Sequence, residues 1–237
     1  MQLLIDIGLV LLGYLIGSIP SGLIIVKLKT GKDIRQVESG RTGGTNAMRA
    51  AGFWAGLLTA LMDILKGAIA VWLAQWLSPA SQWVHILAPI GAILGHNYSL
   101  YLPEYDEKGR FKRLRGGAGG APALGGAIGL WIPSVLIILP LGALVFFTLG
   151  YASVTTLSVA FFAILVFSLR LALGASEANW SGIFYGVIAG ALLTWALRPN
   201  IKKLLNGTER VVSVSLHGRL KAKQEQREAS DAIEDVE

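Results

Sequence analysis

The residues best suited to chemistry lie in one short run, Ser39–Arg49, which reads Ser-Gly-Arg-Thr-Gly-Gly-Thr-Asn-Ala-Met-Arg. An apolar segment follows, and a helix that begins here would leave backbone N–H groups unpaired and carry partial positive charge. Ser39, Thr45 and Asn46 can donate hydrogen bonds, and Arg49 can bind two phosphate oxygens at once. The backbone can approach a ligand closely at Gly40, Gly43 and Gly44. The run therefore predicts a cradle for a phosphate group.

A second stretch repeats this construction. The polar segment Pro103–Arg115 carries five basic residues and is followed by Gly-Gly-Ala-Gly-Gly and another apolar run. Arg113 or Arg115 would supply positive charge there, and the glycines would supply a nest of backbone N–H groups. The alternative is that the glycines serve close helix packing and the basic residues serve only membrane topology. If both loops lie on one side of a membrane, they can converge on a single phosphate pocket.

The composition indicates an integral membrane protein. Of the 237 residues 53% are hydrophobic and only 15% are charged, with a mean hydropathy of +0.57, whereas soluble domains carry about a quarter charged residues. The absence of cysteine and the three scattered histidines predict neither a metal site nor a thiolate enzyme. In so apolar a chain, the net charge of +6 indicates loops that face anionic lipid and not a nucleic-acid partner.

The apolar segments predict an all-α integral membrane protein with seven transmembrane helices and glycine-rich cytoplasmic loops. The expected spans are Leu3–Val26, Gly52–Leu77, Trp83–Leu102, Gly116–Ile132, Pro133–Tyr151, Ala152–Leu169 and Trp180–Leu197. The first span should bend or unwind locally near Pro20. We expect one membrane domain over residues 1–207 and a charged cytoplasmic tail over 208–237, to which the sequence assigns no chemistry.

The distribution of basic residues predicts the orientation. With seven spans and the amino terminus outside, all but two of the 21 Lys and Arg residues lie on the cytoplasmic side, and the exceptions are Lys66 within a helix and Arg170 outside. Such a bias supports both the span count and a cytoplasmic carboxyl terminus.

Three polar residues in the apolar segments have two interpretations each. Asp63 and Lys66 stand three residues apart on one helical face, where each lowers the cost of burying the other. They can support the first loop structurally or take part in acid–base chemistry. His96, near the end of the third expected span, can serve as a hydrogen-bonding residue or as a catalyst.

Three motifs of this sequence resemble those of a known family. The pattern Ser39-Gly40-x-x-Gly43-x-Thr45-Asn46-x-x-Arg49, followed by Asp63-x-x-Lys66-Gly67, resembles the first motif of the membrane-integral bacterial acyl-phosphate:glycerol-3-phosphate acyltransferases, the PlsY family. Gly95-His96-Asn97 with Gly116-Gly117-x-Gly119 resembles the second motif, and Gly150-Tyr151-x-Ser153 resembles the third. The likeness extends in order over about residues 10–207.

The resemblance implies a function. A fatty acyl group would pass from acyl phosphate to the sn-1 hydroxyl of glycerol 3-phosphate at the cytoplasmic face of the bacterial cell (inner) membrane, giving lysophosphatidic acid and phosphate. It implies no metal, no cofactor and no acyl-enzyme, and the lipid bilayer is the expected surrounding of a monomer. The resemblance also implies residue roles: catalysis by Ser39, Thr45, Asn46 and Arg49; substrate-phosphate contacts from Gly40, Arg41, Gly43, Gly44, Arg115, Gly116, Gly117, Gly119, Ser153 and Asn200; and support from Asp63, Lys66, His96 and Asn97.

The chain departs from the family pattern at three places. Ala118 stands where the glycine loop usually has a lysine, Leu197 stands where a histidine is usual, and Arg41 replaces an asparagine. We expect Arg41, Arg113 or Arg115 to supply the missing charge. Two alternatives to an active acyltransferase stay open: a divergent or inactive member acting on another phosphorylated acceptor, and an anion transporter.

Overall fold

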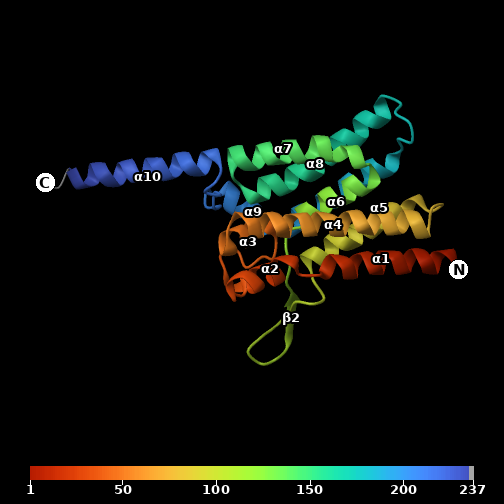
Figure 1. The fold of residues 1–237 in the computed structure, drawn as a ribbon, viewed down its shortest axis with the longest axis horizontal. Coiled ribbons are helices and arrows are strands. Elements are labelled where there is room, and N and C mark those ends of the chain that lie inside the picture. The colour runs from red at the N-terminus through yellow and green to blue at the C-terminus, as the bar shows by residue number, and fades with distance from the viewer. Residues whose placement is uncertain (235–237) are drawn as a thin grey trace.

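The chain folds mainly into long helices that run side by side, with the amino terminus at one end of the bundle and the carboxyl-terminal helix leaving the other (Figure 1). This computed structural model describes residues 1–234, so the last three residues of the predicted tail lie outside the described residues. The helices are α1 (Gln2–Ser18), α2 (Ser21–Thr30), α3 (Gly44–Ala51), α4 (Phe53–Leu77), α5 (Gln82–Asn97), α6 (Gly120–Leu130), α7 (Val135–Leu149), α8 (Ala152–Ala172), α9 (Trp180–Leu205) and α10 (Leu216–Glu234).

Five segments within residues 1–234 are long and apolar enough to cross a membrane: α1 with α2, α4, α7 with the short turn before it, α8 and α9. The prediction of a helical integral membrane protein is confirmed, but the count of seven spans is not. The third and fourth expected spans form the shorter helices α5 and α6. With 11 residues, α6 rises about 16 Å, roughly half the ~30 Å hydrocarbon core, because the glycine-rich stretch before it stays non-helical.

The predicted break in the first span is present. Helix α1 ends at Ser18 and α2 begins at Ser21, because Pro20 lacks the N–H that would continue the helical ladder. The break leaves the carbonyl oxygen of Ile19 facing α4, where the ammonium group of Lys66 donates to it. The same ammonium donates to Asp63 Oδ1 at 2.6 Å, so the ion pair expected from the three-residue spacing is formed.

Small residues allow the bundle to pack closely. Gly13 and Gly17 of α1 lie so near α5 that a Cβ at either position would overlap the backbone carbonyl of Ala88 or Ala92. The largest cluster of buried side chains lies between α5, α6, α8 and α9, around Tyr185, whose hydroxyl donates to the carbonyl of Ala123 at 2.7 Å. Without water in the bilayer, such internal partners are required for buried polar groups.

The polar segment Pro103–Arg115, expected as a loop between helices, contains two short strands. It forms an antiparallel hairpin of β1 (Pro103–Tyr105) and β2 (Phe111–Leu114) that leaves the side of the bundle (Figure 1). The turn between the strands contains Gly109 with a φ of +73°, which glycine adopts without strain. The aromatic residues flanking this turn, Tyr105 and Phe111, favour strands.

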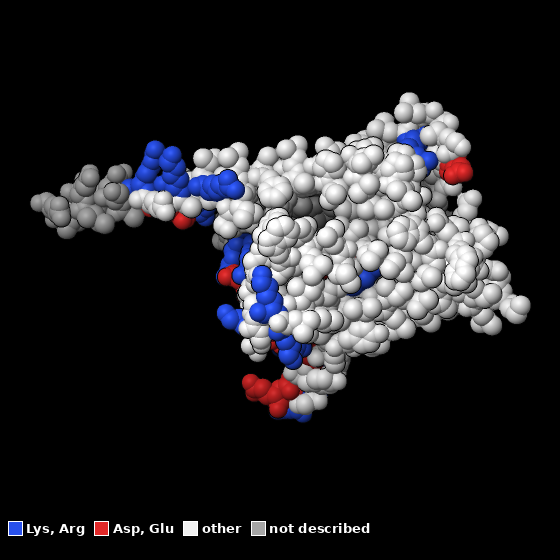
Figure 2. Space-filling view, in the orientation of Figure 1, with Lys and Arg blue, Asp and Glu red and all other residues white. Residues whose placement is uncertain are grey.

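Charge is concentrated at one end of the molecule. In Figure 2 most visible Lys and Arg side chains lie at the end from which α10 projects, and few lie at the opposite end. Between α9 and α10 the chain folds back onto the bundle: Val212 N–H donates to the carbonyl of Gly150 at 2.8 Å, and Val212 and Ser215 are buried. The charged end of the bundle is therefore also where the loops meet.

We predict that Lys66→Met lowers the free energy of unfolding by roughly 3–5 kcal/mol, because it leaves the Asp63 carboxylate buried without its cation. The change is measured as a fall in the thermal midpoint of the detergent-solubilised protein. The double variant Asp63→Asn/Lys66→Met should recover much of the loss, since no buried charge remains. A single variant as stable as the parent protein would contradict this role.

Candidate active site

A cavity of about 550 Å³ opens where the first loop, α4, α7, α8, α9 and the segment after α9 meet. Its polar end is lined by Glu38, Ser39, Arg41, Gly43, Gly44, Thr45, Asn46, Arg49, Asp63, His96, Gly119, Ser153, Asn200, Lys203, Thr208, Glu209 and Arg210. Its other arm is apolar and is lined by side chains of α4, α6, α7 and α8, including Phe53, Leu57, Ile64, Leu124, Ile138, Leu139, Phe146, Phe147 and Val159. The lining of the cavity thus combines charged and polar groups with hydrocarbon side chains.

The first loop is held in shape by Asn46. Its side-chain nitrogen lies 2.8 Å from the carbonyl oxygen of Arg41 and 3.0 Å from that of Val37, and can donate to both. Gly40, with a φ of +64°, turns the chain where a side chain would be strained. The sequence predicts a catalytic role for Asn46, and in the structure its side chain positions this loop. Its side-chain oxygen lies in the cavity wall and has no hydrogen-bond partner.

The start of α3 forms the floor of the polar end. Gly43, Gly44 and Thr45 line the cavity where the helix begins, and the first helical residues have N–H groups without intrahelical acceptors. Arg49 lies in the last turn of α3 and reaches the same chamber. A helix N-terminus and an arginine side chain therefore face one space, as the phosphate-cradle prediction requires.

The second glycine loop, residues 116–120, packs against the first loop. The N–H of Thr42 donates to the carbonyl of Gly116 at 3.2 Å, and the N–H of Gly117 donates to the carbonyl of His96 at 2.8 Å. A Cβ on Gly117 would overlap the His96 ring. His96 and its neighbour Asn97, both buried, thus brace this loop, and His96 Nδ1 lies 3.6 Å from Asp63 Oδ1.

Arg41 joins three parts of the site. Its guanidinium donates to the carbonyl of Gly117 at 2.9 Å, to the carbonyl of Ala196 at 2.8 Å and to Asn200 Oδ1 at 3.1 Å. All three acceptors are neutral. They fix the position of the guanidinium but do not balance its positive charge. Burial lowers the pKa of the Arg41 guanidinium, and the charge of Glu209 partly opposes this shift. An anion in the cavity would supply the missing counter-charge.

Glu209 is a site residue that the sequence did not reveal. Its carboxylate accepts from the hydroxyl of Ser153 at 2.6 Å and from the side-chain nitrogen of Asn200 at 3.3 Å. Burial lowers the pKa of Arg49 and the charge of Glu209 raises it, with burial the larger effect. Glu209 lies in a stretch of mixed charge after α9, where no periodic pattern indicates a return to the bundle. Lys203, Glu38 and Arg210, of which the last two form an ion pair, also line the cavity.

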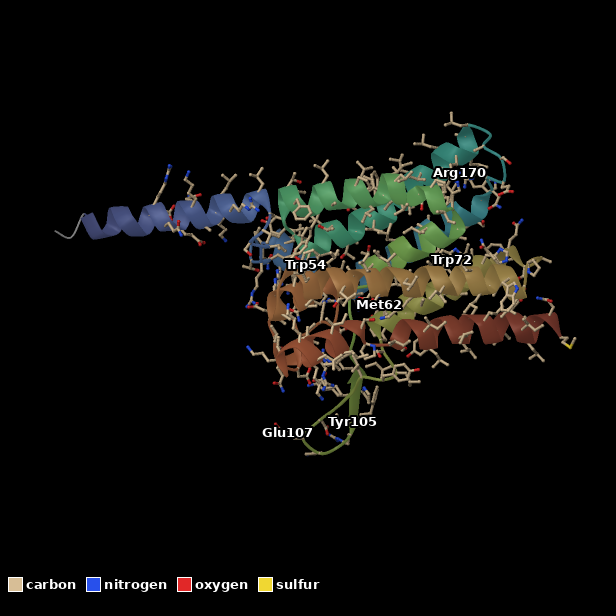
Figure 3. All side chains as sticks on the ribbon, viewed as in Figure 1. Trp54, Met62, Trp72, Tyr105, Glu107 and Arg170 are labelled. Carbon is tan, nitrogen blue, oxygen red and sulfur yellow. The ribbon has the colours of Figure 1, made fainter. Side chains whose placement is uncertain are left out.

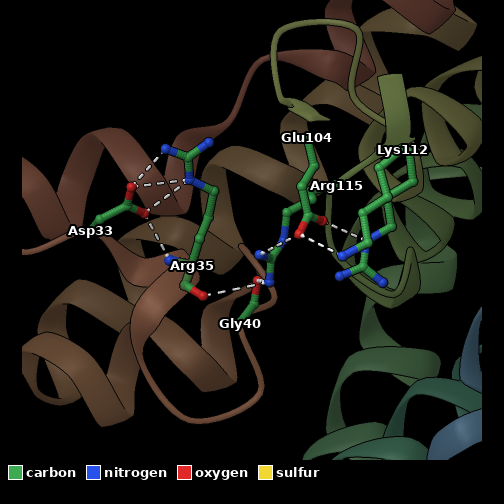
Figure 4. A network of polar contacts seen from close by, with 7 residues as sticks. Asp33, Arg35, Gly40, Glu104, Lys112 and Arg115 are labelled. Atoms are coloured by element: carbon green, nitrogen blue, oxygen red, sulfur yellow. Dashed lines mark hydrogen bonds and ion pairs between the residues drawn. The ribbon is translucent and has the colours of Figure 1, made fainter. Parts of the chain in front are cut away.

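Arg115 does not reach the cavity. Its guanidinium donates to the carbonyls of Gly40 at 3.2 Å and Arg35 at 3.4 Å from behind the first loop (Figure 4), and Glu104 lies 3.9 Å away. Arg113 pairs with Glu104 on the hairpin surface. Of the residues predicted for the site, those that stand behind the cavity wall are Gly40, Lys66, Asn97, Arg115, Gly116 and Gly117. These six residues support the loops that carry the predicted residues lining the cavity.

Comparisons with known proteins agree with this geometry. The family model described as glycerol-3-phosphate acyltransferase matches residues 7–207. The chain belongs to this family. The glycerol-3-phosphate acyltransferase of Rubrobacter xylanophilus is 37% identical over 207 residues, which are 87% of this chain and 95% of the relative. That of a Thermus thermophilus strain is 36% identical over 200 residues, covering 84% of this chain and 92% of the relative.

Solved structures of the same family are also similar. The crystal structure of PlsY, an integral membrane glycerol 3-phosphate acyltransferase, in its glycerol 3-phosphate form has a TM-score of 0.72 and 30% identity, covering 87% of this chain and 94% of that chain. Its lysophosphatidic acid form has a TM-score of 0.69 and 28% identity at the same coverage. The family resemblance stated from the motifs is confirmed, and the matched region contains the cavity up to Lys203.

We predict that Arg41→Asn weakens binding of glycerol 3-phosphate, the ligand named for the solved relative, by roughly 10- to 100-fold, because a charge-assisted hydrogen bond contributes about 1.5–3 kcal/mol. Ala118 lines the cavity beside Gly117, the residue whose carbonyl accepts from Arg41. Adding Ala118→Lys should therefore restore part of the affinity, measured by calorimetry on the purified protein.

The matched control is Arg41→Asn/Ala118→Met, which adds a side chain of similar length without charge and should restore nothing. Equal recovery by methionine and lysine would show that the cation is not what Arg41 contributes.

Proposed function

We propose that this protein transfers a fatty acyl group from acyl phosphate to the sn-1 hydroxyl of glycerol 3-phosphate, releasing lysophosphatidic acid and inorganic phosphate. Membership of the glycerol-3-phosphate acyltransferase family supports this proposal. The observation that carries it is the lining of the cavity, which combines cationic and other polar groups with a large set of apolar side chains. A substrate with a phosphate at one end and an alkyl chain at the other fits both parts at once.

The apolar arm accounts for the donor. It runs from the chamber between α4 and α7, where Leu57, Ile138 and Phe147 belong to the lining. Helix α7 packs loosely and exposes large apolar side chains such as Leu136 and Leu144 to the surroundings. An acyl chain could enter sideways from the bilayer, so its carbonyl carbon and phosphate would lie in the polar chamber.

The chemistry then needs no covalent enzyme intermediate. The hydroxyl oxygen of glycerol 3-phosphate attacks the acyl carbon, the bond from that carbon to the phosphate oxygen breaks, and the phosphate leaves with the electron pair. The hydroxyl proton passes to a phosphate oxygen of the substrate. The N–H groups at the start of α3 and the side chains of Thr45 and Arg49 stabilise the oxyanion and the leaving phosphate. Ser39 lies beside them, in reach of the same phosphate.

The second phosphate has its own set of groups. Arg41, Asn200 and Ser153 line the chamber as one linked set: Arg41 donates to Asn200, and the carboxylate of Glu209 accepts from both Asn200 and Ser153. We assign them to glycerol 3-phosphate, which places its hydroxyl toward the acyl carbon. The residues of a single copy supply both the cationic groups and the apolar lining, so we propose that a monomer is the working unit.

An anion transporter fits the cavity less well. The charged groups gather at one end, and the other arm is apolar, so an anion that entered the chamber would meet hydrocarbon further on. Moving a charge into that arm would cost several kcal/mol. An acyl chain meets no such cost.

The proposal is tested by incubating the purified protein with palmitoyl phosphate and glycerol 3-phosphate. Lysophosphatidic acid and inorganic phosphate should form in equal amounts. If folded protein gives neither product with acyl chains of any length, the proposal fails. If products form with another phosphorylated acceptor and not with glycerol 3-phosphate, the acceptor assignment fails while acyl transfer stands.

We predict that Arg49→Ala lowers kcat/KM by roughly 10- to 100-fold or more, because Arg49 contacts the chamber and the lost charged hydrogen bonds contribute about 1.5–3 kcal/mol. Arg170→Ala is the matched control. Arg170 lies near the far end of the bundle (Figure 3), where its guanidinium stacks over the Trp131 ring. Equal losses in the two variants would show that the site is elsewhere.

We also propose the orientation and the domain limits. The amino terminus lies outside the bacterial inner membrane and the charged end faces the cytoplasm, which the clustering of Lys and Arg at one end supports. We place the acyltransferase domain at residues 1–207, the limit that the family model matches. The carboxyl-terminal tail that follows contributes Glu209 to the site before continuing as α10.

We predict the side of each loop from this orientation. Because the chain has no cysteine, single cysteines report cleanly. Ser176→Cys, in the α8–α9 connection, should react with a membrane-impermeant maleimide on intact cells, whereas Lys221→Cys on α10 should react only after the cells are opened. The reverse pattern would invert the proposed topology.

A further inference from the structure

The hairpin of β1 and β2 has one apolar face. Tyr105 lies opposite Phe111 and Pro103 lies opposite Leu114 in the strand register, and directly opposed residues point to the same face of a sheet. The rings of Tyr105 and Phe111 meet edge to face with centroids 6.4 Å apart. This pair forms the outer part of the face, where β1 and β2 join the turn.

The other face is charged. Glu104 lies opposite Arg113 and accepts from its Nε at 2.6 Å, and Lys112 lies 3.8 Å from the same carboxylate. At the turn, Asp106 pairs with Arg110 at 2.9 Å. From Pro103 to Arg115 the chain has five basic and three acidic residues, so a positive charge remains after these pairs are formed.

The apolar face is exposed. Tyr105 is 58% exposed and Phe111 is 61% exposed, and the chain leading into β1 adds the exposed side chains of Leu100 and Tyr101. A two-stranded hairpin has no interior of its own in which to bury such groups. Each aromatic ring left in water forfeits on the order of 1–3 kcal/mol of burial. The face therefore needs an apolar surrounding.

The position of the hairpin indicates which surrounding this is. It leaves the side of the bundle next to α2, across the direction of the long helices (Figure 1), and carries Tyr105 and Glu107 away from the bundle (Figure 3). The last turn of α2 holds Lys27 and Lys29, and basic residues at the end of a membrane helix mark the level of the lipid headgroups. A hairpin extending sideways at this level lies along the membrane surface.

We propose that this hairpin is a membrane-binding element whose aromatic face inserts among the headgroups of an anionic bilayer. Tyr105 and Phe111 occupy the interface, which favours aromatic rings with one apolar and one wet side. The basic residues of the other face extend toward lipid phosphates. Its base ends in Arg115, which supports the first loop at the carbonyl of Gly40, so the lipid contact also steadies the wall of the cavity.

The test uses single cysteines carrying a nitroxide spin label, in nanodiscs of phosphatidylethanolamine and phosphatidylglycerol. The hairpin labels are Tyr105→Cys and Phe111→Cys on the aromatic face and Lys112→Cys on the charged face. Reference labels are Phe161→Cys, an exposed position on the membrane-spanning α8, and Lys221→Cys, an exposed position on α10. Collision rates are measured with oxygen, which concentrates in the bilayer, and with a nickel chelate, which stays in water.

We expect the labels at 105 and 111 to shift toward the oxygen-rich behaviour of position 161, and the label at 112 to remain near position 221. Because Tyr105→Cys retains Phe111 and Phe111→Cys retains Tyr105, agreement between them guards against loss of the hairpin in one variant. Water-like collision rates at both positions would overturn the proposal. Shielding from both reagents would indicate a protein partner on this face and would overturn it equally.

Discussion

The buried ion pair between Asp63 and Lys66 is the interaction on which the site depends. Lys66 reaches from α4 into the break between α1 and α2, where it donates to the Ile19 carbonyl, which also accepts from the N–H of Ser21. Asp63 faces His96 on α5, and the His96 backbone holds the second glycine loop at Gly117. This pair of charges thus links α4 to the break between α1 and α2 and, through His96, to α5 and the second glycine loop. Its stability rests on each charge having the other, since either alone would be costly inside a bilayer.

The cavity beside this ion pair carries the positive charges of Arg41 and Arg49. Arg41 donates to neutral oxygens, and Arg49 is placed by the last turn of α3. Burial lowers the pKa of both arginines, and the charge of Glu209 raises it against this larger effect. Such cations are under-compensated until anions enter, which favours binding of two phosphates over binding of a neutral lipid. Arg41 donates to the carbonyl of Gly117, next to Ala118, so we propose that the first loop supplies the positive charge that the family pattern places on the second.

Patterns of neighbouring residues in the sequence predicted several features of the fold and the candidate site. The break at Pro20, the Asp63–Lys66 pair and the cradle at the start of α3 each follow from residues within a few positions of one another, and all three are present. The family motifs also placed Ser153 and Asn200 correctly beside the cavity.

What the sequence did not predict depends on contacts between distant residues. Glu209 lines the cavity because the chain after α9 turns back onto Gly150. No periodic pattern of apolar residues in the sequence predicts that turn. Arg115 was expected at the phosphate, yet the hairpin aims it behind the first loop at Gly40. The length of the fourth expected span was also wrong: α6 has 11 residues, because the glycine-rich stretch before it stays non-helical.

The most direct measurement is a structure of the protein with glycerol 3-phosphate and a non-transferable acyl phosphonate bound together. We predict the phosphonate at the start of α3 beside Arg49, the alkyl chain between α4 and α7, and the glycerol 3-phosphate phosphate beside Arg41 and Asn200. An alkyl chain away from the apolar lining, or both phosphorus atoms lying away from these arginines, would contradict the proposed site.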